Sequence, residues 1–434
     1  MHFSVRNPKA RRPRPGTHFA LALALAAGGV LGVSALETPA AAQKKGDQAK
    51  PNYTKGFVEV YQPLGKRLEA QEDPTALKAE IPALTAAVES DDDKFVAGQA
   101  IYTIGVRAED AALQRRGLNM MLESGKIAPE NRALSLFASG QLAYQAEDYA
   151  QARERFEQAA AAGYEDANLQ GLMAETYFAE DNYAAGLASL KQAIEARDQA
   201  GQPVEENWIK RGFAIAYNNQ LADQAADFGK LYIEHYPSPD VWGDAIAVQR
   251  SFYDYDDQSL LDLMRLADRT DSLRSERDYV DYISAADARR LPAEVGRIVD
   301  AGLAANMLNP SDVLVTEAKA TAAAQTGPAR ADVAQLEQDA RGSGATALDA
   351  AAAGDMYLNF DNTAKAIEMY ELALTRPDVD RARVLTRLGI AQVDQGQFAE
   401  AKANFDKVEG PRAAIADLWA LYAEAQLSGG TAAQ

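Results

Sequence analysis

The sequence repeats itself at a constant interval of 34 residues between Ala133 and Ala193. A constant period of this length is typical of stacked helix-turn-helix arrays, in which each unit packs only against its neighbours. The period therefore predicts an all-α chain, and it constrains the architecture more than the function. The matching positions are Gly140, Tyr149, Ala152, Phe156 and Ala159 in the first copy, and Ala174, Tyr183, Gly186, Leu190 and Ala193 in the second.

Small residues in each copy mark the places where two antiparallel helices would touch. Gly140 in the first helix and Ala152 in the second would let the two backbones approach closely. Bulky residues at helical spacing, such as Leu136 and Phe156, would fill the gaps beside that contact. One hairpin cannot bury this face alone, so we expect neighbouring hairpins to stack on it.

In these residues the chain resembles the tetratricopeptide repeat family. The first copy departs from the family pattern in having Ala143 where an aromatic residue is usual, and in lacking the proline near the repeat end. The resemblance implies an α-solenoid of stacked antiparallel helix pairs that winds into a right-handed superhelix. Two further copies near the C-terminus carry the pattern, one with Gly354, Tyr357, Ala366, Tyr370, Ala373 and Pro377, the next with Leu388, Gly389, Gly396, Phe398, Ala401 and Phe405.

The spacing of breaks and repeats predicts the domain organisation. In the alanine-rich part after residue 310, Gly327-Pro328 indicates a turn between two helices of a weak repeat, although a linker is an alternative. The segments are a signal peptide (1–42), a flexible tether (43–55), N-terminal helix pairs (56–128), tetratricopeptide-like repeats (129–310), a degenerate alanine-rich repeat or linker (311–345), C-terminal repeats (346–410), a capping helix (411–427) and a disordered tail (428–434).

The first 42 residues have the composition of an export signal. Arg6 to Arg14 form a basic start, Phe19 to Leu36 are mostly apolar, and three alanines precede Gln43. This order predicts a cleaved secretory signal peptide and a periplasmic protein of a Gram-negative-type bacterium. An uncleaved membrane anchor is the alternative, since the apolar run is just long enough to span a bilayer. Because the chain has no cysteine, we expect neither disulfides nor a lipoprotein anchor.

The charge excludes two classes of partner. The chain has 44 basic and 63 acidic residues, and removal of residues 1–42 would change the formal net charge from −19 to −23. Such a surface repels nucleic acids and anionic lipids. We therefore expect no nucleic-acid partner and no direct insertion into a membrane after signal cleavage.

Side chains for catalysis or metal binding are scarce. Two of the three histidines lie in the signal segment, which leaves His235 alone and excludes a multi-histidine metal site. The acidic cluster at Asp254 to Asp257 does not fit a calcium-binding EF-hand loop, because Ser259 and Arg265 stand where glycine and glutamate are required. We expect no enzyme activity, no metal and no cofactor.

The family resemblance implies a concave groove lined by the first helix of each repeat. Aromatic side chains beside amides and carboxylates can hold an extended peptide or a helix. The alternative is that Phe137 and Tyr144 only pack against the adjacent repeat. The candidate partner-binding residues are Phe137, Gln141 and Tyr144 in the first copy, and Glu175 and Phe178 in the second.

Taken together, the repeats, the signal segment and the missing catalytic clusters predict a non-catalytic interaction scaffold in the bacterial cell envelope. Its expected partner is a protein that contributes a peptide or a helix. Two alternatives remain open: a helical arm that binds cell-wall glycan for a peptidoglycan-processing enzyme, and a hydrolase that uses a pair of carboxylates.

Overall fold

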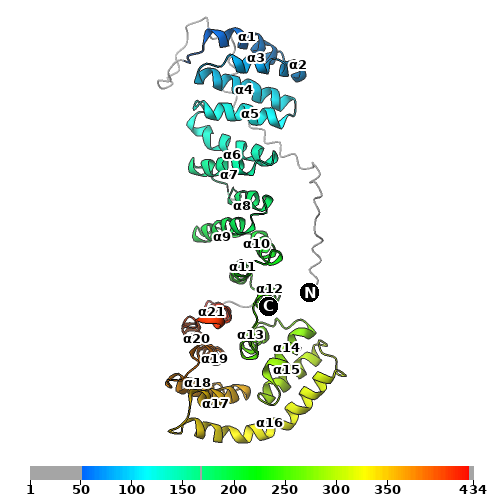
Figure 1. The fold of residues 1–434 in the computed structure, drawn as a ribbon, viewed down its shortest axis with the longest axis vertical. Coiled ribbons are helices and arrows are strands. Elements are labelled where there is room, and N and C mark those ends of the chain that lie inside the picture. The colour runs from blue at the N-terminus through cyan, green and yellow to red at the C-terminus, as the bar shows by residue number, and fades with distance from the viewer. Residues whose placement is uncertain (1–50, 167–168, 430–434) are drawn as a thin grey trace. The chain divides into compact units, whose positions relative to one another are not determined.

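The computed structural model describes residues 51–166 and 169–429. Every regular element within these two ranges is a helix. The chain divides into two compact units, the first ending at Leu169 and the second beginning at Gln170. In each unit, successive helices run antiparallel and stack as hairpins (Figure 1). The expected all-α array of stacked antiparallel helix pairs is confirmed for the described residues.

The described residues of the first unit form seven helices: α1 Lys55–Glu69, α2 Pro74–Lys78, α3 Ile81–Ala86, α4 Asp91–Arg107, α5 Ala111–Glu123, α6 Pro129–Gln145 and α7 Tyr149–Ala161. The second unit takes up the chain one residue into α8 and contains α8 Leu169–Ala179, α9 Tyr183–Gln199, α10 Glu206–Asn218, α11 Ala222–His235, α12 Pro239–Phe252, α13 Asp257–Arg269, α14 Glu276–Ala286, α15 Pro292–Ala304, α16 Val313–Ala340, α17 Ala347–Asn359, α18 Thr363–Leu374, α19 Arg381–Asp394, α20 Phe398–Phe405 and α21 Ala413–Leu427.

A glycine in the first helix of a hairpin faces an aromatic ring in the second. A Cβ atom placed on Gly140 would lie 2.5 Å from Cε1 of Phe156, far inside van der Waals contact. The ring therefore occupies the space that a side chain would need, and the two helices cross closely. The same contact, always sixteen residues apart, recurs as Gly212 with Phe228, Gly354 with Tyr370, and Gly389 with Phe405.

The start of the first unit is held against α4. The backbone N–H of Asn52 donates to Asp92 at 2.8 Å, and both the N–H and the hydroxyl of Thr54 donate to Asp93. Burial raises the pKa of Asp93, but these hydrogen bonds and those from residues 89 and 90 outweigh burial and lower it. The sequence predicts a flexible tether up to residue 55, but Asn52 and Thr54 are hydrogen-bonded to α4. Residues 43–50 lie outside the described ranges.

Within the N-terminal helix pairs expected over residues 56–128, the sequence predicts one helix from Pro74 to Ser90, but the structure divides this segment into α2 and α3. Pro82 sits in the first turn of α3. Because proline has no N–H, it cannot donate to the carbonyl four residues earlier, and a continuous helix through this point would lose that bond. The break falls just before it, at residues 79 and 80.

The alanine-rich segment is one continuous helix, so the turn expected at Gly327-Pro328 is wrong. Helix α16 runs for 28 residues with Pro328 inside it, and Figure 1 shows it between α15 and α17. Alanine has the strongest helix propensity and is frequent on both sides of the proline. That propensity, together with packing against α15 and α17, outweighs the one backbone bond that the proline removes.

The expected capping helix, α21, covers α20 and also contacts α11 and α13 of the same unit. Its side chains Ile415, Leu418 and Trp419 are buried. The second unit therefore closes on itself, with its last helix against helices from its first half (Figure 1). No helix in the described part of the chain is both long enough and apolar enough to cross a membrane. The proposed signal segment and residues 430–434 lie outside the described ranges.

Candidate binding groove between helices α5 and α6

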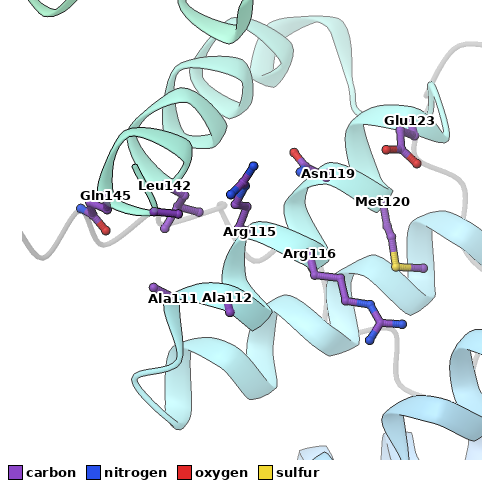
Figure 2. A pocket seen from close by; sticks show the side chains of 10 residues that line it. Ala111, Ala112, Arg115, Arg116, Asn119, Met120, Glu123, Leu142 and Gln145 are labelled. Carbon is purple, nitrogen blue, oxygen red and sulfur yellow. The ribbon is translucent and has the colours of Figure 1, made fainter. Parts of the chain in front are cut away.

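A cavity of about 490 Å³ lies in the first unit between α5 and the C-terminal end of α6. Figure 2 shows Gln145 and Leu142 near one end of it, Glu123 at the other end, and Arg115 between them. We call this cavity the α5–α6 groove. Its lining residues are Ala111, Ala112, Arg115, Arg116, Asn119, Met120 and Glu123 of α5, and Leu142, Gln145 and Ala146 at the end of α6.

The helical period of α5 explains which residues face the groove. One side of α5 buries Gly117, Leu118, Met121 and Leu122 against the core. At Gly117 the approach to α4 is so close that an added Cβ would lie 2.4 Å from the backbone nitrogen of Tyr102. The opposite side of α5 is left uncovered, and the last turn of α6 forms a wall beside it.

Arg115, on α5, is held in place by side chains at the start of α7. It donates to Asp148, the residue that caps the N-terminus of α7, and to the side-chain oxygen of Gln151 at 2.8 and 3.0 Å. The hydrogen bond from Arg115 and one from the backbone of Gln151 lower the pKa of Asp148 below its ordinary value. Asn119 accepts from the Ser139 hydroxyl at 2.8 Å. The charge of Arg115 is thus compensated inside the protein.

Arg116, unlike Arg115, donates to a hydroxyl group and not to a carboxylate among the described residues. Its guanidinium donates to the hydroxyl of Thr85 at 2.8 Å, and no carboxylate within the described residues forms an ion pair with it. It is exposed and lines the groove. No acidic residue occurs between Asp110 and Glu123, although the chain as a whole has a net charge of −19. Arg116 is therefore a cation that an incoming group can reach.

The structure places three of the predicted partner-binding residues in the first unit, on α6. Phe137 is only 3% exposed and stacks on Tyr164 with ring centroids 4.3 Å apart. Tyr144 is half-buried and meets Tyr149 edge-to-face. Gln141 is partly exposed. Phe137 thus belongs to the core, and Gln141 and Tyr144 retain surface one turn or less from Gln145, which lines the groove.

The other two predicted residues, Glu175 and Phe178, belong to the second unit and are engaged there. Glu175 forms an ion pair with Arg211, whose guanidinium also lies 5.5 Å from the ring centroid of Phe178. Phe178 is 8% exposed, and a Cβ on Gly186 would lie 2.4 Å from its ring. These two residues therefore pack within their own unit, and neither is among the residues that line the α5–α6 groove.

The residues of α5 that line the groove were not predicted from the sequence. The family comparison considered only the first helix of each repeat, whereas α5 is the second helix of its hairpin. The signal that would have found it is the pair Arg115-Arg116 in a stretch without acidic residues. The pattern of charged residues along one helix indicates such a site, whereas the position of a residue within the repeat does not.

The acidic cluster before α13 contributes the N-cap of that helix. Asp256 caps the N-terminus of α13 by accepting from the backbone N–H of Ser259 at 2.6 Å. Within residues 51–166 and 169–429, no three acidic or histidine side chains lie together in a way that could hold a metal ion.

Proteins similar to this chain are found among the solved structures. No protein-family model matches the chain, and no curated protein matches it. Similar solved structures include the TPR2AB domain of yeast Sti1 in a pHSP90 complex, with 14% identity, a TM-score of 0.24, and coverage of 69% of this chain and 94% of that chain. A tetratricopeptide repeat protein from Parabacteroides merdae has 12% identity and a TM-score of 0.26, covering 69% of this chain and 99% of that one.

A third similar structure is the Cut9–Hcn1 hetero-tetramer of the APC/C, with 13% identity, a TM-score of 0.20, and coverage of 86% of this chain and 84% of that chain. These likenesses concern the fold alone. The family resemblance rests on the chain itself: its 34-residue period, its order of antiparallel hairpins and the glycine–aromatic contact at the helix crossings. In these features the repeats of this chain resemble those of tetratricopeptide repeat proteins.

Proposed function

We propose that this chain is a non-catalytic scaffold that binds a protein partner, and that the partner contributes an acidic segment to the α5–α6 groove. The observation that carries the proposal is Arg116, an exposed cation in a groove, with a hydroxyl partner and no carboxylate partner among the described residues. A carboxylate from a partner would complete that arrangement with a charge-assisted hydrogen bond.

The lining of the groove supports a peptide as the occupant. Met120 and Leu142 provide apolar surface, and Gln145 provides an amide that can bond to a backbone. From Ala112 to Glu123 the wall formed by α5 is about 16 Å long at 1.5 Å per residue. An extended segment of about five residues, at roughly 3.3 Å each, matches that length.

The cellular setting is the second part of the proposal. The basic start, the apolar run and the alanines within residues 1–42 are the features of a secretory signal. A scaffold exported on such a signal works in the cell envelope, with the periplasm as its compartment. The partner is then another envelope protein with an exposed acidic segment.

Charge reversal at Arg116 tests the proposal. Partners would first be captured from envelope extract with the unaltered protein and identified, and an acidic peptide from the captured partner would be titrated against the purified protein. Arg116→Glu should weaken binding of that peptide by at least about tenfold, since one charge-assisted hydrogen bond contributes roughly 1.5–3 kcal/mol.

Arg132→Glu is the matched control, because Arg132 is an exposed residue of α6 outside the groove and the substitution changes the net charge equally. The control should bind the peptide as the unaltered protein does. Equal weakening by both substitutions would mean that only overall charge matters and would refute the groove as the site.

A further inference from the structure

The face of α5 that lines the α5–α6 groove carries one exposed charge of each sign. Arg116 and Glu123 are both exposed, and the partly exposed Met120 lies between them along the helix. The step from Arg116 to Glu123 is about two turns of an α-helix, so the two side chains leave α5 in nearly the same direction. One face of the groove therefore presents a cation, then an apolar side chain, then an anion.

Neither charge has an ion-pair partner among the described residues. Arg116 donates to the hydroxyl of Thr85. Lys126, the basic residue closest to Glu123 in the sequence, pairs with Asp92 at 2.9 Å instead. Side chains on one helix meet when they are three or four residues apart. Arg116 and Glu123 are separated by about 10.5 Å along the axis, at 1.5 Å per residue, so they do not neutralise each other.

The third charged residue that lines the groove is compensated inside the protein. Arg115 pairs with Asp148. The groove therefore offers an incoming segment one cation, Arg116, and one anion, Glu123. A segment with acidic residues at both places would be repelled by Glu123 and by the net charge of −19 on the chain. Charge complementarity thus requires a basic group opposite Glu123 as well as a carboxylate opposite Arg116.

The separation of the two charges sets the spacing that a bound segment needs. An extended chain in the polyproline II conformation advances about 3.1 Å per residue and has three residues per turn. Two side chains three positions apart then face the same side and lie about 9 Å apart, close to the separation on α5. A β-strand turns side chains three positions apart to opposite faces. The groove therefore fits a segment in the polyproline II conformation.

We propose that the α5–α6 groove recognises an extended peptide with an acidic residue and a basic residue three positions apart. The carboxylate binds Arg116, the basic group pairs with Glu123, and the chain between them passes over Met120. Glu123 is then a specificity-determining residue, because it discriminates against a segment with a second acidic residue at that position. The inference rests on the function proposed above and adds the second charge of the partner segment.

The test uses the purified full chain and a library of short random peptides displayed on phage. Peptides selected by the unaltered protein should carry an acidic and a basic residue three positions apart. One of them is then synthesised in two forms, with its basic residue and with alanine in its place. Both are titrated by fluorescence anisotropy against the unaltered protein, Glu123→Ala and Glu157→Ala. Glu157 is the matched control, since it is an exposed acidic residue of α7 outside the groove.

Loss of the basic residue should weaken binding to the unaltered protein and to Glu157→Ala by at least about threefold, as expected for a partly exposed ion pair. Binding to Glu123→Ala should not change, because the partner of the basic residue is already absent. Equal losses on all three proteins would overturn the inference.

The selection separates this inference from the function on which it rests. Selected peptides that share an acidic residue, lose affinity for Arg116→Glu and have no basic residue at the stated spacing would overturn the inference and leave the proposed function intact. Selection of peptides without an acidic residue, or of no peptide at all, would overturn both.

Discussion

The guanidinium of Arg387 on α19 donates to the carboxylate of Asp262 on α13, a residue 125 positions earlier in the chain, and both side chains are buried. In an open solenoid each repeat contacts only its neighbours, and stability is a sum of local contributions. This bond, with those that Arg412 and Trp419 donate to Asp262, ties distant parts of the second unit together. The second unit should therefore unfold more cooperatively than a linear array.

Substitution of Asp262 tests how much these long-range contacts contribute to stability. Asp262→Ala removes the carboxylate to which buried Arg412 donates, and one of the two that buried Arg387 contacts, the other being Asp355. Removing one partner of a buried pair costs about 3–5 kcal/mol. We expect a loss of that size in the free energy of unfolding, measured by urea denaturation.

The matched substitution is Asp417→Ala, which removes an exposed carboxylate from its pair with Lys230. An exposed pair contributes about 0–1 kcal/mol, so this variant should differ little from the unaltered protein. Similar losses for the two variants would show that burial does not increase the contribution of Asp262 to the free energy of unfolding.

Stability of the second unit should fall in acid because of Glu294. Burial by itself raises the pKa of Glu294, but the charge of Arg265 and hydrogen bonds from Arg265 and Tyr282 outweigh burial and lower it from 4.5 to about 2. The unfolded chain binds the proton first, so this contribution is present above about pH 5 and is lost as the pH falls towards 2. The shift corresponds to about 3 kcal/mol.

The measurement is the free energy of unfolding between pH 7 and pH 2, for the unaltered protein and for Glu294→Gln. The variant has no carboxyl group to titrate at this position, so its stability should depend less on pH in that window. Parallel curves for the two proteins would contradict the assignment.

The helix hairpins could be predicted from the sequence, because the residues that define the 34-residue period lie close together in the chain. Gly140 and Phe156 were placed at a helix crossing, and the structure brings them together. The long-range contacts of Asp262 could not be predicted. Asp262 and Arg265 look like the polar face of an ordinary amphipathic helix, and nothing local indicates that their partners lie as far away as Arg412.

The candidate site was predicted only in part for a related reason. Gln141 and Tyr144 were chosen from repeat positions, which identify faces of the first helix of a hairpin but not the exposed side of the second. Arg116 lies on such a second helix. Phe137 and Phe178 were chosen by the same rule but are buried by contacts with Tyr164 and Gly186, because an aromatic side chain at a repeat junction fills the nearest gap.

The crossing glycines should resist substitution. A Cβ on Gly389 would lie 2.4 Å from Cε1 of Phe405, and the buried ring has little room to move. Gly389→Ala should therefore lower the free energy of unfolding by about 1–3 kcal/mol. Gly327→Ala is the control, since its Cβ would meet no atom within 4 Å. Within α16 that change should raise stability by up to about 1 kcal/mol. Thermal denaturation of both variants checks the opposite signs.

Pro328 should be a weak point of α16. The residue is exposed inside the helix, where proline removes one backbone hydrogen bond and crowds the preceding turn. Pro328→Ala should stabilise the helix by about 1–3 kcal/mol, and hydrogen exchange of the amides in α16 should slow. Unchanged exchange would mean that packing against α15 and α17 already holds the helix fully.

The central claim, that the α5–α6 groove is where the partner binds, is tested most directly by cross-linking in the native cell. A photo-reactive residue would replace Gln145, which lines the groove, and in a second strain Arg132, which is exposed on the same helix outside it. We expect a specific cross-linked partner from position 145 and none from position 132, with mass spectrometry placing the link in an acidic segment. Equal labelling at both positions, or labelling at position 132 alone, would contradict the assignment of the groove.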